Sequence, residues 1–235
     1  LRPKKGDRNL PSCYRPISLI NSIFKVNGAA ILARITSLAE DCNLQYGFRK
    51  KLGMIDQVLN FHWITSKYVI IKKGSLYVEF VDLSQAFDSV NRDILNTIGL
   101  DPHLVSFIID LHSNITAATS LDGQRGLSKV IDINRGVKQG CILAPYLFNI
   151  YTNNLDSHLQ TMAYDSPRVG ERRIPILLYT DGAMLMSRTP RGLQQLINGY
   201  TAFMQDLDLS VNCSKSYTMI LSKNPIKRKH SFTSN

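Results

Sequence analysis

The sequence predicts an α+β or mixed α/β fold. Several segments carry apolar residues at helical spacing, whereas residues 74–83 are rich in residues that favour strands. Residues 174–187, IPILLYTDGAMLMS, consist of two apolar runs on either side of a polar tip that carries Asp181-Gly182, which is the pattern of a β-hairpin. The helical and strand segments follow one another in irregular order, and together with the hairpin this indicates the class.

The first half of the chain contains two expected helices and one strand. SIFKVNGAAILARITSLAED has roughly helical spacing, so we expect a helix over about 22–40. In GSLYVEFVDL, residues 74–83, alternate apolar residues would share one face of a strand. Asp101-Pro102 is a suitable helix start, with Asp as N-cap and Pro as the first helical residue, and we expect that helix over about 102–117.

The second half adds two helices and a final strand. Pro145 is expected to open a helix over about 145–158. Another apolar stripe predicts a helix over about 190–207, and its members are Leu193, Leu196, Ile197, Tyr200, Met204 and Leu207. YTMILS, residues 217–222, is the last expected strand.

The charge of the chain favours a polyanionic partner. The 235 residues include 28 Lys and Arg against 18 Asp and Glu, a formal net charge of +10, which favours nucleic acid. Basic residues open the chain and nearly close it, and they form a cluster at 49–51, although a short basic tail at 227–229 is also typical of a solvated surface. No apolar run is long enough to predict a membrane span.

The four cysteines do not predict a metal centre. Cys13, Cys42, Cys141 and Cys213 are widely spaced, and no His lies at zinc-ligand spacing from any of them. The chain lacks an export signal at its start, so we expect reduced thiols inside the cell. It begins at Leu1, and we expect it to be a piece of a longer polypeptide.

Two aspartates are the candidate metal ligands. Asp82 ends an apolar strand and Asp181 lies at the tip of the expected hairpin. If the two strands are neighbours, both carboxylates emerge at one edge of the sheet, where they could share the pair of Mg²⁺ ions that nucleotidyl transfer requires. For Asp181 alone, an ordinary Asp-Gly hairpin turn is the simpler interpretation.

A set of ordered motifs resembles the reverse transcriptases of non-LTR, LINE-like retrotransposons. The motifs in the expected palm are FVDLSQAFDSV (80–90), RGVKQGCILAPYLFNIY (135–151) and LLYTDG (177–182). YRPISLINSIFKV (14–26) and QYGFRKKLGMIDQVL (45–59) are similar to the fingers motifs of the same family, and RTPRGLQQLINGYTAF with LSVNCSKS is similar to its later palm segment. The resemblance covers residues 3 to about 223.

The resemblance implies roles for the residues at the centre of the palm. Asp82 and Asp181 would bind metal, together with the backbone carbonyl of Val81. Lys215 would assist departure of pyrophosphate, although a surface lysine is an equally good interpretation. Phe87 would be the steric gate that excludes a 2′-hydroxyl, unless it is simply a core aromatic.

Other residues would contact the incoming nucleotide. Gln139 matches the glutamine that borders the nucleotide and the template base, and Gly140 and Gly136 would permit close backbone approach. Arg49 and Lys50 would contact the triphosphate. The implied substrates are an RNA template, a DNA primer and deoxynucleoside triphosphates, with two Mg²⁺ (or Mn²⁺) as cofactors and, as is typical of the family, nuclear action.

Gly182 departs from the family pattern. The family has Tyr-x-Asp-Asp where this chain has Tyr179-Thr180-Asp181-Gly182. Gly182 should preserve the turn, but it removes one of three carboxylates and should weaken metal binding. KKLGM (50–54) and a short 92–102 segment also differ from the family. The two hypotheses are therefore an impaired RNA-directed DNA polymerase and a catalytically dead remnant that binds nucleic acid.

The resemblance also implies the domain organisation. The fold would be the right-hand polymerase palm and fingers, with a three- or four-stranded antiparallel palm sheet packed on helices and the thumb outside this chain. Residues 1–75 would belong to the fingers, 76–223 mainly to the palm and 224–235 to a basic tail, all within one reverse transcriptase domain.

Overall fold

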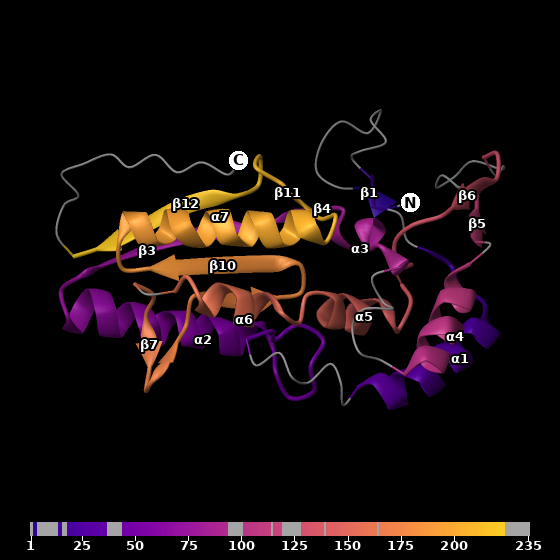
Figure 1. Ribbon diagram of the computed structural model, residues 1–235, viewed down its shortest axis with the longest axis horizontal. Helices are drawn as coiled ribbons and strands as arrows, with labels where there is room; N and C mark the ends of the chain where they lie inside the picture. Colours follow the sequence, from indigo (N-terminus) through magenta and orange to yellow (C-terminus); the bar gives the residue numbers. More distant parts are fainter. Residues whose placement is uncertain are drawn as a thin grey trace. The chain divides into compact units, whose positions relative to one another are not determined.

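Four strands pair in the order β12-β3-β10-β9 to form an antiparallel sheet (Figure 1). Their bounds are Ser75–Val81 for β3, Ile176–Tyr179 for β9, Gly182–Ser187 for β10 and Tyr217–Ser222 for β12. The expected strands at 74–83 and 217–222 and the expected hairpin are thereby confirmed, as are the antiparallel order and the number of strands.

The structure, a computed structural model, describes residues 2–3, 14–15, 18–36, 44–93, 101–113, 115–118, 128–138, 140–163 and 165–223. The chain divides into two units, residues 1–36 with 87–148 and residues 37–86 with 149–235. The second unit contains the four-stranded sheet. Its helices are α2 (Met54–Thr65), which continues as the π-helix η3 (Ser66–Ile71), α6 (Leu155–Gln160) and α7 (Pro190–Asp206).

Helices of this unit contact the sheet from two sides. α7 contacts β10 and β3, whereas α2 contacts β9 and η3 contacts β3; in Figure 1, α7 and α2 run along opposite sides of β10. On the α2 side, the ring of Phe61 meets the ring of Phe80 edge-on at 6.4 Å. Leu76 and Val78 of β3 and Leu185 of β10 are completely buried, so the core of this unit lies around the two central strands.

The N-terminus of α7 follows directly from its sequence. Thr189 is the N-cap, and its hydroxyl accepts a hydrogen bond from the amide of Gly192, while Pro190 occupies the first helical position. The buried residues Leu193, Leu196, Ile197, Tyr200 and Met204 form the expected stripe. The helix predicted over 190–207 is therefore confirmed, with its end at Asp206.

The first unit contains α1 (Ser22–Ile35), α4 (Pro102–His112) and the strand pair β5 (Ile115–Ala117) and β6 (Ile131–Ile133). Phe24 of α1 meets the buried His112 of α4 edge-on at 5.8 Å between ring centroids. As expected, the Asp101 carboxylate caps α4 by accepting from the amides of His103 and Leu104. The expected residues 37–40 of the first helix lie outside the described residues.

Two expected helices have other bounds. The helix expected over 102–117 ends at His112, because Ser113 is extended and donates its hydroxyl to Ile109 O, and Ile115 then begins a strand that pairs with β6. The helix expected over 145–158 is two helices, α5 (Ala144–Tyr151) and α6. Thr152-Asn153-Asn154 separates them, and residues of these types are poor helix formers because their side chains compete for backbone hydrogen bonds.

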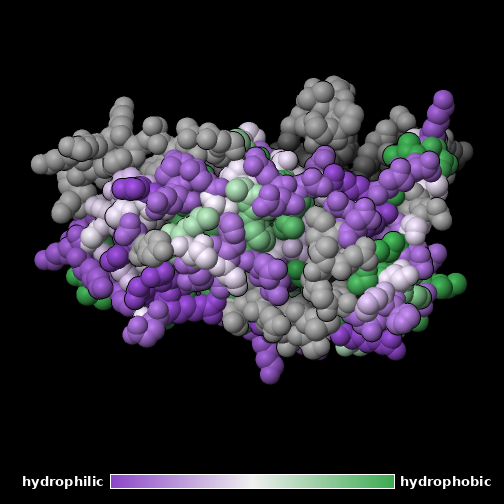
Figure 2. Space-filling model, in the orientation of Figure 1, coloured by the Kyte–Doolittle hydropathy of each residue, from purple (hydrophilic) through white to green (hydrophobic). Residues whose placement is uncertain are grey.

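Short elements complete the described fold. These are β1 (Arg2–Pro3) with β2 (Tyr14–Arg15), β4 (Leu83–Ser84) with β11 (Ser210–Val211), β7 (Arg168–Val169) with β8 (Arg172–Arg173), and α3 (Ala86–Ser89). On the face shown in Figure 2, hydrophilic residues predominate and hydrophobic residues form small separate groups. Among the described helices, none has the length and apolar composition needed to cross a membrane.

Candidate active site

The carboxylates of Asp82 and Asp181 belong to the same end of two paired strands. Ala183 of β10 pairs with Val81 of β3 in the antiparallel register. One step further along this register, Gly182 lies across from Asp82, and Asp181 is the next residue of the loop. The prediction that the two aspartates emerge from neighbouring strands at one sheet edge is therefore confirmed.

The loop between β9 and β10 consists of Thr180 and Asp181, because Tyr179 pairs with Gly182. The expected position of the turn was one residue too late, since Gly182 is already the first residue of β10. Thr180 has a φ of 57°, whereas Gly182 is not among the glycines with positive φ. The strained position of the hairpin is thus a β-branched residue, and such a residue is rare in this conformation.

Lys215 lies beside the first carboxylate. Its Nζ is 3.2 Å from Oδ2 of Asp82, and the side chains are 62% and 34% exposed, respectively. The segment before β12 holds this arrangement, because Asn212 N donates to Asp82 O at 2.8 Å and Asp82 N donates to the hydroxyl of Ser216 at 3.2 Å. The lysine singled out by sequence therefore neutralises a candidate metal ligand.

The pKa of the Tyr200 hydroxyl, on α7, responds to burial and to both carboxylates. Burial raises the pKa of its hydroxyl well above the ordinary value, and the negative charges of Asp181 and Asp82 raise this pKa further. The side chain is 1% exposed. Like an ordinary tyrosine it is neutral across the physiological range, so it adds no negative charge to the two aspartates.

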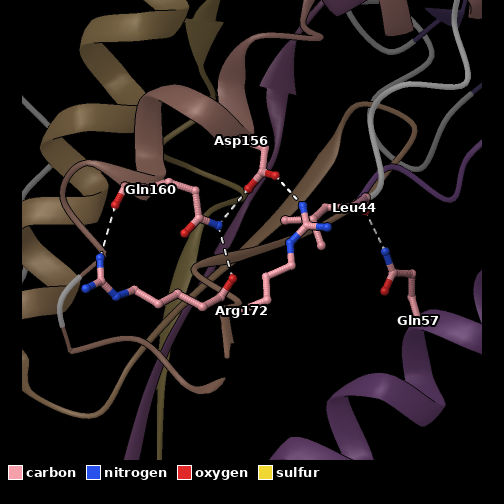
Figure 3. A network of polar contacts seen from close by, with 6 residues as sticks. Leu44, Gln57, Asp156, Gln160 and Arg172 are labelled. Atoms are coloured by element: carbon pink, nitrogen blue, oxygen red, sulfur yellow. Dashed lines mark hydrogen bonds and ion pairs between the residues drawn. The ribbon is translucent and has the colours of Figure 1, made fainter. Parts of the chain in front are cut away.

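Sequence reasoning missed three buried amides near the loop, of which only Gln45 contacts it. Gln45 pairs with the backbone of Thr180, Gln57 donates to the carbonyls of Leu44 and Leu178, and Asn149 donates to a carbonyl in the same segment as Gln45. Figure 3 shows Gln57 extending from α2 toward Leu44. The available signal was their position among apolar neighbours, because a buried amide needs a hydrogen-bond partner.

A second polar network in Figure 3 is structural. Arg172 forms an ion pair with Asp156 at 2.5 Å, and the amide of Gln160 donates both to Asp156 and to the carbonyl of Arg173. It ties α6 to the short β7–β8 hairpin. Its acidic member is paired with arginine and contributes nothing to the two carboxylates at the sheet edge.

A cavity of about 460 Å³ adjoins the carboxylate end of the sheet. Gly182, Asp82 and Lys215 contribute to its wall, and the rest is mainly apolar. The other lining residues include Met54, Val58 and Phe61 of α2, Leu177 of β9, Met184 of β10 and Tyr217 of β12. Because Gly182 has no side chain, the cavity wall is open at the position where the family has the second aspartate of the turn.

The oxygen donors at this edge fit a hard divalent cation, although they are few. Carboxylate and carbonyl oxygens are the ligands that Mg²⁺ prefers, and Asp82, Asp181 and the carbonyl of Val81 are of this kind. The ammonium of Lys215 is paired with Asp82, so a metal ion there would compete with it. Among the described residues, no group of three or more His, Cys, Asp or Glu is arranged to hold a metal ion.

The predicted nucleotide contacts fall in different parts of the chain. Arg49 and Lys50 follow the Gln45 segment in the second unit, with Arg49 Nη1 3.4 Å from Gln45 O and Lys50 exposed. Phe87 and Gly140 belong to the first unit. Gln139 lies outside the described residues. Their contacts with a nucleotide stay predictions.

Phe87 and the glycines of GVKQGC have clear local environments. Phe87 is half-buried and its ring lies 5.1 Å from that of Phe148, so both the gate and the core interpretation stay open. Its carbonyl accepts from Val137 N at 2.8 Å. Gly136 has a φ of 83°, and a Cβ there would lie 2.5 Å from Asp88 O, so only glycine fits. Gly140 also has a positive φ, of 108°. The close backbone approach at Gly136 is a contact within the protein, and the approach of these glycines to a substrate stays a prediction.

Sequence comparisons relate the chain to proteins of retroelements. The Pol polyprotein of the retrotransposable element R2 from Popillia japonica is 27% identical over 224 residues, 93% of this chain and 31% of that protein. The RNA-directed DNA polymerase from the mobile element jockey of Drosophila melanogaster is 24% identical over 217 residues, 86% of this chain and 23% of that protein. The chain thus spans less than a third of the length of these relatives.

Solved structures show the same fold. A telomerase from Candida Tropicalis, in complex with a TWJ fragment of telomeric RNA, superposes with a TM-score of 0.57 at 12% identity, covering 85% of this chain and 34% of that one. The resemblance to the polymerases of LINE-like elements is confirmed by the names of the relatives. The family model described as "Reverse transcriptase (RNA-dependent DNA polymerase)" matches residues 2–232, and the chain therefore belongs to the reverse transcriptase family.

Proposed function

We propose that this chain is the palm and fingers part of an RNA-directed DNA polymerase of a retroelement. Its active site would lie at the end of the central strands β3 and β10 that carries Asp82 and Asp181. The observation that carries the proposal is the register that brings Asp82 to the loop of Asp181, with the ammonium of Lys215 beside Asp82. The substrates would be an RNA template, a DNA primer and deoxynucleoside triphosphates, as the relatives' names suggest.

Asp82, Asp181 and the carbonyl of Val81 would hold Mg²⁺. When bound, the ions would supply the positive charge that stabilises the attacking and leaving oxygens in nucleotidyl transfer. The chain's own contribution is to place two carboxylates at the same end of two paired strands. Lys215 lies within reach of the same edge and would contact the leaving pyrophosphate once it separates from Asp82.

The remaining assignments follow the family motifs. Residues 1–75 would form the fingers and 76–223 mainly the palm, with 224–235 as a basic tail. Arg49 and Lys50 would contact the triphosphate, Phe87 the sugar, and Gln139 with Gly140 the nucleobase side of the pocket. The positive charge of the chain supports binding of nucleic-acid phosphates.

Gly182 sets the expected level of activity. A missing group this close to the metal ions should lower metal affinity or activity by about 10–100-fold, the range found for groups just outside the ligands themselves. A second candidate function follows from the same observation. With two carboxylates at the site among the described residues, the chain would be a remnant that binds nucleic acid without extending a primer.

The test is primer extension on an RNA template with Mg²⁺. The unaltered chain, Asp82→Asn and Gly182→Asp are compared at equal concentration. Polymerase function predicts weak extension that Asp82→Asn abolishes and Gly182→Asp increases. If Gly182→Asp also fails to extend while all three proteins bind the duplex, the missing carboxylate is not what limits extension, and the departures at 50–54 and 92–102 or the thumb outside this chain account for the loss. Loss of binding affinity as salt rises would show that this binding uses phosphates.

A further inference from the structure

The hydrogen bonds around Thr180 connect a buried glutamine to a candidate metal ligand. Gln45 is 2% exposed, and its side-chain amide binds both backbone groups of Thr180: Nε2 donates to Thr180 O at 2.9 Å, and Oε1 accepts from Thr180 N at 3.0 Å. Oε1 also accepts from Gly47 N at 2.8 Å. One side chain therefore satisfies three backbone groups in and beside the loop.

The loop needs such support because of its conformation. Thr180 has a φ of 57°, and a β-branched residue persists in this sparsely populated region only where the surrounding structure holds it. Gln45 supplies the hydrogen bonds for this conformation. A hairpin with positive φ at the first loop residue usually has glycine there, so threonine at this position points to a constraint other than the turn itself.

The threonine hydroxyl provides that constraint. Thr180 Oγ1 donates to Oδ1 of Asp181 at 2.9 Å. The path from Gln45 to the carboxylate is thus continuous: the amide fixes the Thr180 backbone, and the Thr180 side chain holds one oxygen of Asp181. Glycine at position 180 would relieve the backbone but would lose this hydrogen bond.

The segment that carries Gln45 is itself fixed against β9. Gln45 forms a parallel bridge with Leu178, and Asn149 donates to Gly47 O at 3.0 Å. Gly47 is essential to the approach, because a Cβ there would lie 2.4 Å from Thr180 N. The amide of Gln45 consequently meets the loop in one position only.

We infer that Gln45 is a positioning residue that sets, through Thr180, the orientation of the Asp181 carboxylate and hence the metal affinity of the site. The inference rests on the proposed function, in which Asp82 and Asp181 hold a divalent cation. Groups that orient metal ligands typically change affinity by about 10–100-fold when removed. We expect about a tenfold loss here, because Gln45 acts through one intermediate residue.

The experiment measures Mn²⁺ binding to the whole chain by the electron paramagnetic resonance signal of free Mn²⁺, beside amide hydrogen exchange and the thermal unfolding midpoint. Three variants are compared with the unaltered chain, and Gly182→Asp is measured beside them as a test of the metal site itself. Gln45→Leu removes all three hydrogen bonds, and Thr180→Val removes only the hydroxyl while keeping the shape. Gln57→Leu is the matched control, since it removes a buried amide that binds Leu44 and Leu178 but makes no contact with the loop.

The inference predicts weaker Mn²⁺ binding in both Gln45→Leu and Thr180→Val, with faster exchange at Thr180 N and Gly47 N only in Gln45→Leu. Gln57→Leu should lower the unfolding midpoint without changing Mn²⁺ affinity. Should Gln45→Leu fail to fold, Thr180→Val decides the outcome. Unchanged affinity in Thr180→Val, or equal losses in Gln45→Leu and Gln57→Leu, would overturn the positioning role alone. If neither the unaltered chain nor Gly182→Asp binds Mn²⁺, the proposed metal site fails and the positioning role fails with it.

Discussion

Replacing Gly182 with aspartate should restore a carboxylate across from Asp82 without disturbing the fold. A Cβ built at Gly182 meets only Tyr179 O, at 3.4 Å, an ordinary contact. Because Gly182 is not among the glycines with positive φ, an aspartate there would meet no backbone strain. The positive φ of this hairpin lies at Thr180 instead.

The magnitude follows from three contributions. Removing a glycine from a strand stabilises the fold by about 0.5–1 kcal/mol. Repulsion between like charges about 4 Å apart costs about 1 kcal/mol in water and about 4 kcal/mol near a protein surface, so the metal-free protein should lose up to about 3 kcal/mol of stability. A restored group at the metal should raise affinity about 10–100-fold, which corresponds to about 1.4–2.7 kcal/mol.

The assay is Mn²⁺ titration of the unaltered chain, Gly182→Asp and Gly182→Asn, followed by primer extension with each. Asparagine has the size of aspartate but no charge, so it separates the effect of filling the open space from the effect of the carboxylate. We expect tighter Mn²⁺ binding and greater extension only with aspartate. Equal behaviour of the Asp and Asn variants, or no gain with either, would refute the reasoning about the missing charge.

Three other predictions concern the first unit. Lowering the pH from 7 to 5 should destabilise the protein, because burial lowers the pKa of His112 below its ordinary value of 6.5 and the unfolded chain then binds a proton that the folded chain does not. Chemical denaturation at both pH values should show a smaller loss of stability in His112→Leu. Gly136→Ala should lower the unfolding midpoint markedly, since its Cβ would overlap the Asp88 backbone, whereas Gly170→Ala, with positive φ but open space, should have a smaller effect in the same thermal scan. Phe87→Ala, assayed in the Gly182→Asp background, should admit ribonucleotides more readily, and unchanged sugar discrimination would assign this half-buried ring to the core.

The hairpin and its aspartates could be predicted from sequence because they depend on local patterns. Two apolar runs around a polar tip predict paired strands, and the pairing then places Asp82 near Asp181. The loop position was wrong by one residue, because Asp-Gly is a strong turn signal and the hydrogen bonds of Gln45 to Thr180, 135 residues away in the chain, carry no local signature. The same reason hid Gln57 and Asn149, whose partners are backbone carbonyls.

Helix ends were the other features that local patterns could not predict. An apolar repeat continues through Ile115, but Ile115 pairs with Ile133, and that tertiary contact ends the helix at His112. Asn153 and Asn154 separate α5 from α6 despite continuing apolar spacing. The sequence pattern thus identified the apolar, periodic residues, whereas tertiary contacts such as the pairing of Ile115 with Ile133 decided whether those residues are helical.

The ion pair between Lys215 and Asp82 has a consequence for the order in which ligands arrive. With the ammonium present, the two aspartates and the lysine carry a net charge of about −1 rather than −2, so the site repels a nucleic-acid backbone less than its acidic residues alone would. In the proposed polymerase, template and primer would therefore meet less repulsion at this site before a divalent ion binds. A cation that binds Asp82 would then displace the ammonium, and Lys215 would become available to the phosphates of a nucleotide.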